Sequence, residues 1–493
     1  MTATVAAFLQ TIDGAQVAAA DGGVLDSVDP STGAGWATVP RGGSADVDRA
    51  VAAADRARVS WRDLGAAGRA RHLRRVADVF AGHGDELSEI KTRDNGRILA
   101  DTRGLDLPSC VEMWHYFAGA ADKLHGDTVD IGPEAFTFTR REPVGVVGVV
   151  LPWNAPLSLF TAKVAAALAG GNTVVVKPAE QASCSVLRAA ALISEAQALP
   201  PGVLNVVAGL GAEVGEALVR HPGVGRITFT GSTATARTIS TAAAPTLTPL
   251  AFELGGKSPN IVFADADLDA AAVGVSTMSL FTGNAGQTCI AGSRILVHES
   301  IVDDLLARVE KIASGVRLGD PMDPATTMGP IVSAGQLERV RSYLALGLGA
   351  DGGAELVFGG RSGADLFPAG SAHAGGYYVE PTLFRGTNDL RIAREEIFGP
   401  VGVVLTFRND DEALALANDS PYGLACGVWT TDLTRAHRCI RDVEAGAVWV
   451  NTYRKNHWAL PFGGVKDSGY GRDSGMESVL EGTVLKSAWI DLP

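Results

Sequence analysis

From residue 144 onward, short runs of apolar residues alternate with stretches in which apolar residues recur at helical spacing. Strands that alternate with helices along a chain are typical of a parallel sheet with crossover helices. The helical stretches lie near residues 157–169, 185–198, 211–220 and 232–241. The apolar runs are Val144–Leu151, Thr173–Lys177, Val203–Val207 and Arg226–Thr230. This part of the chain is therefore predicted to form an α/β unit.

The same alternation resumes after Glu253 and predicts a second α/β unit. Within it, the glycine-rich stretch Gly347–Gly376 is interpreted as an insertion or a surface loop. The apolar runs of this second unit are Asn260–Phe263, Arg294–Val297, Val401–Phe407, Ala425–Thr430 and Ala447–Val450.

The segment before these units predicts a turn followed by helices. Asp29–Gly33 has the composition of a turn, and Ser44 precedes an alanine-rich helix expected over residues 45–58. Further helices are expected near residues 68–83 and over Val111–Lys123. We interpret the aromatic residues of the last helix as core residues in preference to a substrate funnel.

Two segments alternate apolar and polar residues in the manner of exposed strands. They are Thr128–Arg140 and Thr483–Leu492. Hairpins that project from an α/β body are unstable alone, so pairing with another subunit is expected.

The composition favours a folded protein and argues against nucleic acid as a partner. Hydrophobic residues make up 46% of the 493 residues and charged residues 20%, as in globular proteins. Acidic residues outnumber basic ones by 55 to 42, and no run of lysine and arginine is suited to a phosphate backbone. Nucleic acid is therefore not an expected partner.

Neither a secretory signal nor a membrane span is expected. Met1–Gly14 lacks a charged region before a long apolar stretch. Val144–Ala162 carries no charge, but Pro152 and Pro156 interrupt it where lipid requires intact backbone pairing. We therefore expect a cytoplasmic protein without a membrane partner.

The cysteines offer one candidate nucleophile. Five cysteines without CxxC or Cys/His spacing indicate neither a disulfide framework nor a metal site. Cys289 lies among small residues between Phe281 and Arg294, where the sulfur has room and no partner cysteine. A lone cysteine is more often a small buried hydrophobic residue, so this position is weak evidence by itself.

Two polar residues follow predicted strands, where α/β proteins collect functional groups. Glu253 stands immediately before a glycine turn, and Asn154 lies on a strand-to-helix turn between two prolines. The Asn154 amide could donate to a developing oxyanion. Taken singly, the two residues also fit a surface glutamate and a turn-forming asparagine.

The signals for phosphate binding are weaker. Gly209, Gly211 and Gly215 follow a predicted strand, but their spacing is not that of the dinucleotide fingerprint. Phe229–Thr233 opens a helix after a strand, so its free N–H groups and the Ser232 hydroxyl could hold a diphosphate. Simple helix capping by Ser232 is the alternative.

Together these motifs resemble the aldehyde dehydrogenase superfamily across essentially the whole chain. The matching motifs are Pro152–Asn154 (PWN), Lys177–Glu180 (KPAE), Gly231–Thr233 (GST), Glu253–Pro259 (ELGGKSP), Gly286–Cys289 (GQTC), Glu395–Pro400 (EEIFGP) and Pro461–Gly469 (PFGGVKDSG).

The resemblance implies an α/β fold with a Rossmann-like cofactor domain, a second α/β catalytic domain and a small β-hairpin oligomerisation element. Residues 1–123 and 144–252 would form the NAD-binding domain, and residues 253–479 the catalytic domain. Residues 124–143 and 480–493 would be the oligomerisation segments of a homodimer or homotetramer.

The resemblance also implies oxidation of a small-molecule aldehyde to the carboxylic acid with NAD. A Cys289 thiolate would attack the aldehyde to give a thiohemiacetal, and the Asn154 amide with the Cys289 backbone N–H would support the oxyanion. Glu253 would activate the water that hydrolyses the thioester, and Lys163 would help to relay its proton. Asp473 replaces a glutamate usual in the family, so its shorter side chain could fall short of a relay water shared with Lys163.

By the same resemblance, Lys177 and Glu180 would bind the adenosine ribose of NAD, and Glu396 would hold the nicotinamide ribose beside Phe398. The Glu180 carboxylate disfavours NADP because it would repel the 2′-phosphate. The other residues implied in cofactor binding are Trp153, Gly211, Gly215, Thr230, Gly231, Ser232, Leu254 and Gln336.

Two other functions stay open. A CoA-acylating aldehyde dehydrogenase would release the acyl group to CoA, and Glu253 argues against it because that reaction needs no hydrolytic base. A catalytically silent structural or binding protein on the same scaffold is disfavoured by the intact Cys289, Glu253 and Asn154.

The resemblance places residues 454–460 at the border of the aldehyde channel. Arg454 and Lys455 favour a polar or anionic tail on the aldehyde, whereas Trp458 and Phe462 favour an aromatic body. The alternative is that both cations point into solvent or across a subunit contact.

Overall fold

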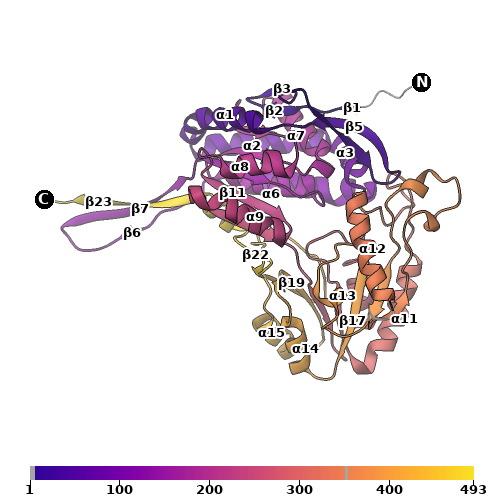
Figure 1. Cartoon of the computed structure of the whole chain (residues 1–493). Coiled ribbons are helices and arrows are strands. Elements are labelled where there is room, and N and C mark those ends of the chain that lie inside the picture. The colour runs from indigo at the N-terminus through magenta and orange to yellow at the C-terminus, as the bar shows by residue number, and fades with distance from the viewer. Residues whose placement is uncertain (1–5, 350–352) are drawn as a thin grey trace.

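The computed structural model describes residues 6–349 and 353–493. In this part of the chain, two α/β units lie against each other and a long, narrow sheet projects from one side (Figure 1). The helices of the described residues are too short or too polar to span a bilayer. The predicted α/β fold class is confirmed.

The first sheet has eight strands in the order β22-β12-β11-β8-β9-β10-β2-β3. Its central strands, from β12 to β10 in this order, run parallel, and they include the four apolar runs predicted after residue 144. The strands are β2 (Gln10–Ile12), β3 (Ala15–Val17), β8 (Val146–Val150), β9 (Thr173–Lys177), β10 (Leu204–Val206), β11 (Arg226–Gly231), β12 (Leu250–Leu254) and β22 (Gly469–Tyr470).

Helices cover both faces of this sheet. Alternate residues of its strands accordingly pack in two different hydrophobic cores. Val147 and Val149 of β8 pack in one hydrophobic cluster, and Val146 and Val150 in another. The helices are α1 (Ser44–Asp63), α2 (Gly65–Gly82), α3 (Gly84–Asn95), α4 (Leu99–Asp101), α5 (Leu107–Ala120), α6 (Pro156–Ala169), α7 (Cys184–Glu195), α8 (Glu216–Arg220) and α9 (Thr233–Ala243).

The aromatic residues of α5 are core residues, as expected. Trp114 and Phe117 are fully buried, and the Trp114 ring packs against Phe80 and Phe160. These rings fix α5 against its neighbours α2 and α6 on one face of the first sheet.

The N-terminal segment differs from the prediction of a turn followed directly by helices. Before α1, the strands β1 (Ala6–Ala7), β4 (Val24–Asp29) and β5 (Ala34–Pro40) form a separate sheet, and β2 and β3 join the edge of the first sheet. The predicted turn is present, with the Ser31 N–H donating to Oδ1 of Asp29 at 2.9 Å. These strands are short or half-exposed, so they lack the apolar runs that identify buried strands.

The second sheet has seven strands in the order β15-β16-β17-β14-β13-β19-β20 and is parallel except for β15. Its strands are β13 (Pro259–Val262), β14 (Arg294–His298), β15 (Glu355–Phe358), β16 (Thr382–Arg385), β17 (Val401–Phe407), β19 (Ala425–Trp429) and β20 (Ala447–Val450). The associated helices are α10 (Leu268–Val275), α11 (Val302–Ser314), α12 (Ala334–Leu348), α13 (Arg391–Arg394), α14 (Asp410–Asn418) and α15 (Leu433–Asp442).

The glycine-rich stretch Gly347–Gly376 is more structured than the predicted insertion or surface loop. It includes the end of α12 and the edge strand β15, which pairs antiparallel with β16. Residues 350–352 of the stretch lie outside the described residues. A four-residue, partly exposed edge strand among glycines carries too little pattern to be predicted.

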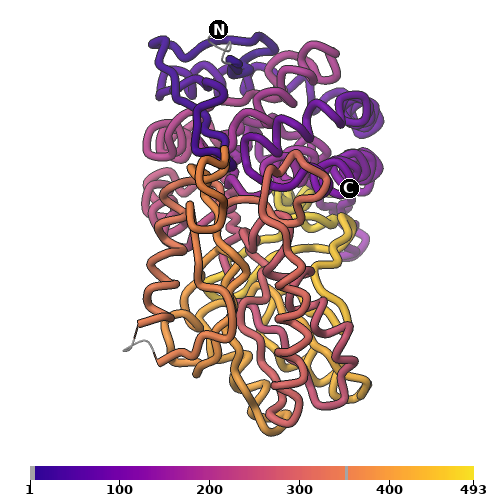
Figure 2. Tube along the Cα trace, turned by 90° about the vertical axis from the view of Figure 1, so that its right-hand side faces the viewer, coloured from indigo at the N-terminus to yellow at the C-terminus, as the bar shows by residue number. Residues whose placement is uncertain are grey.

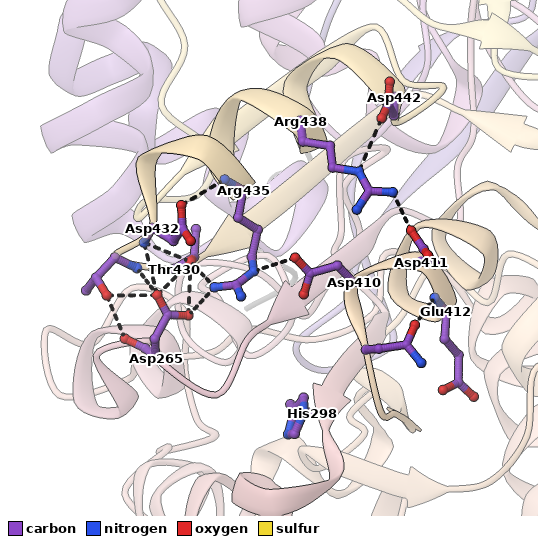
Figure 3. Close-up of polar contacts among 12 residues, drawn as sticks. Asp265, His298, Asp410, Asp411, Glu412, Thr430, Asp432, Arg435, Arg438 and Asp442 are labelled. Atoms are coloured by element: carbon purple, nitrogen blue, oxygen red, sulfur yellow. Dashed lines mark hydrogen bonds and ion pairs between the residues drawn. The ribbon is translucent and has the colours of Figure 1, made fainter.

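An ion-pair network ties together one end of this second unit (Figure 3). Arg435 of α15 lies 2.9 Å from Asp265, which follows β13, and 2.9 Å from Asp410 of α14. Arg438 contacts Asp411 and Asp442. Because these side chains are partly exposed, each pair contributes little alone, but together they connect two helices to the loop after β13.

The two units are interleaved at their junction. The predicted boundary before Glu253 falls inside β12, and β22 returns from the C-terminal part of the chain to place Gly469 opposite Glu253. Helix α16 (Gly475–Glu481) then packs on α6 of the first unit. In Figure 2 the yellow C-terminal segment accordingly runs up to the part of the molecule drawn in indigo and purple. A two-residue strand leaves no periodic signal, so the sequence gives no sign of this return.

The third sheet projects from the body (Figure 1). It has the order β23-β7-β6 and consists of β6 (Thr128–Val129), β7 (Ala135–Pro143) and β23 (Thr483–Asp491). β7 and β23 pair antiparallel from Thr483 opposite Pro143 to Asp491 opposite Ala135. The two predicted exposed strand segments therefore pair with each other.

Candidate active site

Cys289 lies in the segment between α10 and β14, beside the glycine turn that follows β12. It is partly exposed, whereas the other four cysteines of the chain are buried. A Cβ atom added at Gly256 would lie 3.1 Å from the Cys289 carbonyl oxygen, so the two backbones lie close together. The fold thus places the candidate nucleophile next to the ELGGKSP turn.

The surroundings of Cys289 keep its thiol protonated. Burial raises the pKa of Cys289 to about 12, and the negative charges of Glu253 and Glu396 act in the same direction. The backbone N–H of Ile290 and the charge of Arg454 lower the pKa by a smaller amount. Because the thiolate is the nucleophilic form, the thiol needs a base to take its proton during attack.

The PWN turn between β8 and α6 is attached directly to the cysteine segment. The Asn154 side-chain amide donates to the Gln287 carbonyl oxygen at 3.2 Å, and the Asn284 amide donates to the Asn154 carbonyl oxygen at 3.2 Å. Asn95, at the end of α3, donates to the Trp153 carbonyl oxygen at 2.8 Å. Asn154 is thereby held over the segment that carries Cys289.

Buried amides that the sequence analysis did not single out shape this segment. The Gln287 side chain donates to the carbonyl oxygens of Asn284 and Pro330 and accepts from the Val332 N–H at 2.9 Å. Asn95 and Asn284 have the supporting contacts described above. A buried asparagine or glutamine among small residues is the only signal they leave in the sequence, and turn formation explains that signal equally well.

Glu253 ends β12 as a buried carboxylate without a partner. Only 5% of the residue is exposed, and within the described residues neither carboxylate oxygen has a hydrogen-bond partner. Burial raises the pKa of Glu253 well above its usual range, and the charge of Asp473 raises it further while Lys163 opposes the shift. A Cβ atom at Gly463 would lie 2.5 Å from Oε1 of Glu253, so the glycine of the PFGG motif leaves room for the carboxylate. Buried groups of this kind are costly to folding and concentrate at functional sites.

Lys163 and Asp473 form a buried ion pair beside Glu253. The Lys163 Nζ atom lies 2.8 Å from Oδ2 of Asp473 and donates to the Thr228 hydroxyl at 2.9 Å. The Asp473 and Phe462 backbones are paired by two hydrogen bonds of 2.8 and 2.7 Å. The shorter side chain of Asp473 therefore still reaches Lys163 directly.

Lys177 and Glu180 form an ion pair of 2.6 Å at the end of β9. Burial lowers the pKa of Lys177 against the effect of Glu180. Burial acts to raise the pKa of Glu180, but the charge and hydrogen bond of Lys177 together with backbone N–H groups lower it overall. Gly211 lies alongside, because a Cβ atom there would be 3.9 Å from Nζ of Lys177, and it begins the helical turn Gly211–Gly215.

The ends of β11 and β12 lie side by side. Their parallel register places Thr230 opposite Glu253 and Gly231 opposite Leu254. Ser232 accepts a hydrogen bond from the Thr235 N–H at 3.2 Å, so it caps α9, as the alternative interpretation held. The cap leaves other N–H groups of the first turn of α9 available to an anion.

Glu396 and Phe398 lie across from these strand ends. Glu396 accepts from the Gly256 N–H at 3.1 Å, and burial raises the pKa of its carboxyl to about 7. A Cβ atom at Gly255 would overlap this carboxylate. The Phe398 ring packs edge-to-face on Trp153 with centroids 5.1 Å apart.

Gln336 supports the same segment. Its side-chain amide donates to the carbonyl oxygens of Ile397 and Phe398, at 3.1 and 2.9 Å. Gln336 therefore holds the backbone that carries Phe398.

The residues present fit a dinucleotide. A charged Lys–Glu pair, a helix N-terminus and a second carboxylate surround the glycine turns at the strand ends, which is where α/β proteins bind nucleotides. The absence of a side chain at Gly255 lets the Glu396 carboxylate lie against this glycine turn.

Comparisons with known proteins identify the family. The sequence profile of the Aldehyde dehydrogenase family matches residues 17–488. DhaS of Bacillus subtilis (strain 168) is 41% identical over 484 residues, which cover 98% of this chain and 95% of the relative. The structure of PnpE from Pseudomonas sp. WBC-3 in complex with nicotinamide adenine dinucleotide has a TM-score of 0.94 at 42% identity and covers 98% of this chain and 97% of its own. An NAD+ complex of an aldehyde dehydrogenase from Bacillus cereus has a TM-score of 0.94 at 40% identity, over 99% and 97% of the two chains. Since a family profile spans nearly the whole chain and the motifs lie together in one site, the chain belongs to the aldehyde dehydrogenase family.

Proposed function

We propose that this NAD-dependent aldehyde dehydrogenase acts through Cys289 as nucleophile and Glu253 as the base for hydrolysis. The observation that carries this proposal is the buried, unpartnered carboxylate of Glu253 beside the one partly exposed cysteine of the chain. Such a carboxylate costs folding energy, and a catalytic role explains why it is retained.

The reaction begins when the Cys289 thiol gives its proton to a base. The sulfur then forms a bond to the aldehyde carbon while the carbon–oxygen π bond breaks. Negative charge then develops on the former carbonyl oxygen. The Cys289 backbone N–H and the Asn154 amide donate to that oxygen. The Asn154 amide has two N–H donors, and only one of them donates to the Gln287 carbonyl oxygen. Loss of a hydride from the thiohemiacetal carbon gives the thioester, and the chemistry that NAD would supply when bound is acceptance of that hydride.

Hydrolysis of the thioester depends on Glu253. Its carboxylate takes a proton from a water molecule, the water oxygen attacks the thioester carbon, and the carbon–sulfur bond breaks to release the acid and Cys289. Lys163 and Asp473 adjust the charge around Glu253 and help to pass the proton on. A raised pKa makes Glu253 a stronger base but leaves less of it ionised at neutral pH.

For the cofactor, we assign the adenosine ribose to Lys177 and Glu180 and the nicotinamide ribose to Glu396 beside Phe398. Trp153 and Ser232 are assigned to the adenylate and diphosphate side, and the remaining cofactor-binding residues are Gly211, Gly215, Thr230, Gly231 and Leu254. NAD is preferred over NADP because Glu180 would repel a 2′-phosphate by roughly 4 kcal/mol at 4 Å and an effective dielectric near 20. The adjacent Lys177 and solvent reduce this penalty.

The projecting sheet supports a homo-oligomer, a dimer or a tetramer. Its strands leave large apolar side chains exposed, among them Phe136, Trp489 and Ile490. An exposed patch of this kind on a narrow sheet marks a surface that another chain covers.

Rapid mixing of the enzyme with NAD and an aldehyde tests the two roles. Cys289→Ala should form no NADH, whereas Cys439→Ala, at a buried cysteine of α15, should retain turnover. Glu253→Gln should release one equivalent of NADH per site in a burst and then turn over roughly 10²- to 10⁴-fold more slowly than the wild type.

Three results would contradict the assignment. Full turnover by Cys289→Ala would remove the nucleophile, and an unchanged steady state in Glu253→Gln would remove the base. Turnover that requires CoA in the wild type would favour the CoA-acylating alternative instead.

A further inference from the structure

A cavity of about 550 Å³ opens where the two units meet, next to the cysteine segment. Its wall includes Thr282 and Gly283, immediately before Asn284, and the loop residues Tyr453, Arg454 and Lys455. The Tyr453 hydroxyl donates to the carbonyl oxygen of Ile290, the residue after Cys289, at 2.8 Å. Tyr453 therefore connects the lining of the cavity to the residue that follows the nucleophile.

The charges around this cavity do not balance. Arg97 lies 3.2 Å from Asp101 and 3.2 Å from Asp106, and Asp106 is also in contact with the buried Lys91. Both carboxylates thus already have cationic partners. Within the described residues, the side chains of Arg454 and Lys455 form no ion pair and no hydrogen bond.

Arg454 is the better placed of these two surplus cations. Its side chain is half-buried, whereas Lys455 is exposed. Burial and then the charge of Arg97 lower the pKa of Arg454, and the charges of Asp101 and Asp106 oppose this shift only in part. A half-buried guanidinium without a partner is stabilised by any anion that reaches it.

The backbone holds Arg454 in place. Its φ angle is +57°, a left-handed conformation that costs energy for a residue other than glycine or asparagine. The neighbours on both sides are anchored, Tyr453 through Ile290 and Lys455 through its carbonyl oxygen, which accepts from the Trp449 indole at 2.7 Å. Because these contacts hold the backbone of Arg454 in a strained conformation, they also fix the direction in which the Arg454 side chain leaves the backbone.

We propose that the aldehyde oxidised here carries a carboxylate at the end remote from the aldehyde group and that Arg454 binds this carboxylate. The planar guanidinium can donate two parallel hydrogen bonds to a carboxylate, which fixes direction as well as charge. Met278 and Phe281 line the same cavity and provide apolar surface for the carbon chain between the two ends. The inference rests on the proposed function, because it assumes that Cys289 attacks the aldehyde end.

Matched pairs of straight-chain aldehydes test the proposal, each pair with the same carbon number and one member carrying a terminal carboxylate. Hexanal with 6-oxohexanoate is the central pair, and shorter and longer pairs find the best length. The wild type should show the higher kcat/KM for the carboxylated member of at least one pair.

Arg454→Asn is the informative variant, because asparagine adopts the left-handed conformation readily. It should lower kcat/KM for the carboxylated aldehyde by about 10- to 100-fold, mainly through a higher KM. The fold loss in kcat/KM for the neutral aldehyde of the pair should be at least ten times smaller. Arg454→Lys should fall between the two, since it keeps the charge without the planar fork. Arg441→Asn, at an exposed arginine of α15, is the matched control and should change neither member.

Equal losses for both members in Arg454→Asn, or no preference for a carboxylated aldehyde in the wild type at any chain length, would overturn the proposal while leaving aldehyde oxidation intact. If the wild type oxidises neither member of any pair, the proposed function fails together with the inference.

Discussion

At the scale of the residue, burial and two neighbouring charges determine the pH at which Glu253 can act as a base. Its pKa is raised first by burial and then by Asp473, and Lys163 lowers it. Lys163 and Asp473 are themselves an ion pair of 2.8 Å. Removing either member therefore leaves the other's charge acting on Glu253 without compensation.

Opposite shifts are expected from the two single variants. The rate of thioester hydrolysis should rise with pH to a plateau, because only ionised Glu253 takes a proton from water. Lys163→Met removes a positive charge and should move the midpoint of this rise upward by roughly one pH unit, whereas Asp473→Asn should move it downward by a similar amount. Steady-state rates measured across pH, with the NADH burst used to count folded sites, give both midpoints.

The double variant is the control for this experiment. With both charges removed, the midpoint should lie close to that of the wild type. Shifts of the same sign in the two single variants would exclude this electrostatic coupling.

At the scale of the element, Asp94 connects three segments of the first unit. From the end of α3, its carboxylate accepts from the Ser27 hydroxyl of β4 at 2.8 Å and from the Cys184 N–H at the start of α7 at 2.8 Å. Burial raises the pKa of Asp94 to about 6, although these hydrogen bonds lower it. The next residue, Asn95, holds the PWN turn, so this connection also positions Asn154.

The raised pKa gives a pH dependence of stability with a definite sign. Unfolded Asp94 ionises near pH 4, whereas the folded residue holds its proton to about pH 6. Its contribution to stability is therefore fully present below pH 4 and is lost as the pH rises to 6, by about 3 kcal/mol in total.

Asp94→Asn should remove this dependence. The thermal unfolding midpoints of the variant and the wild type are measured at pH 4.5 and at pH 7. Relative to the wild type, the midpoint of the variant should be higher at pH 7 than at pH 4.5. Asp78→Asn, at an exposed aspartate of α2, should show no such change. A difference that stays constant between the two pH values would mean that Asp94 is ionised in the folded state throughout.

At the scale of the whole molecule, the projecting sheet is notable for its exposed apolar side chains. β23 is exposed along nearly its whole length, and both faces of the sheet carry apolar side chains. A three-stranded sheet without a packed face is marginal in water, so we expect a second copy to cover it.

Trp489→Asp combined with Leu485→Asp should therefore reduce the oligomer to monomers, since both side chains lie on one face of β23. Light scattering coupled to size-exclusion chromatography measures the mass. Val24→Asp, at an exposed valine of β4 in the separate N-terminal sheet, is the control and should leave the mass unchanged. An unchanged mass in the double variant would move the interface to another surface.

The order of apolar runs along the chain was enough to predict both α/β units, because a buried strand or helix shows its period within a few neighbouring residues. The same locality explains what was missed. β1 to β5 are short or exposed, and β22 has two residues, so none of them has a periodic core face. Their places depend on the rest of the fold.

By itself, the sequence determined the chemistry available: a cysteine among small residues, a glutamate and an asparagine at strand ends, and ordered motifs that identify the family. Only the tertiary structure decided how these groups act on one another. The approach of Lys163 to Asp473, the burial of Glu253 and the surplus charge of Arg454 join residues far apart in the chain. Local patterns cannot report such distances, because charge and burial depend on every segment that packs nearby. NADP discrimination and the oligomeric state stay predictions.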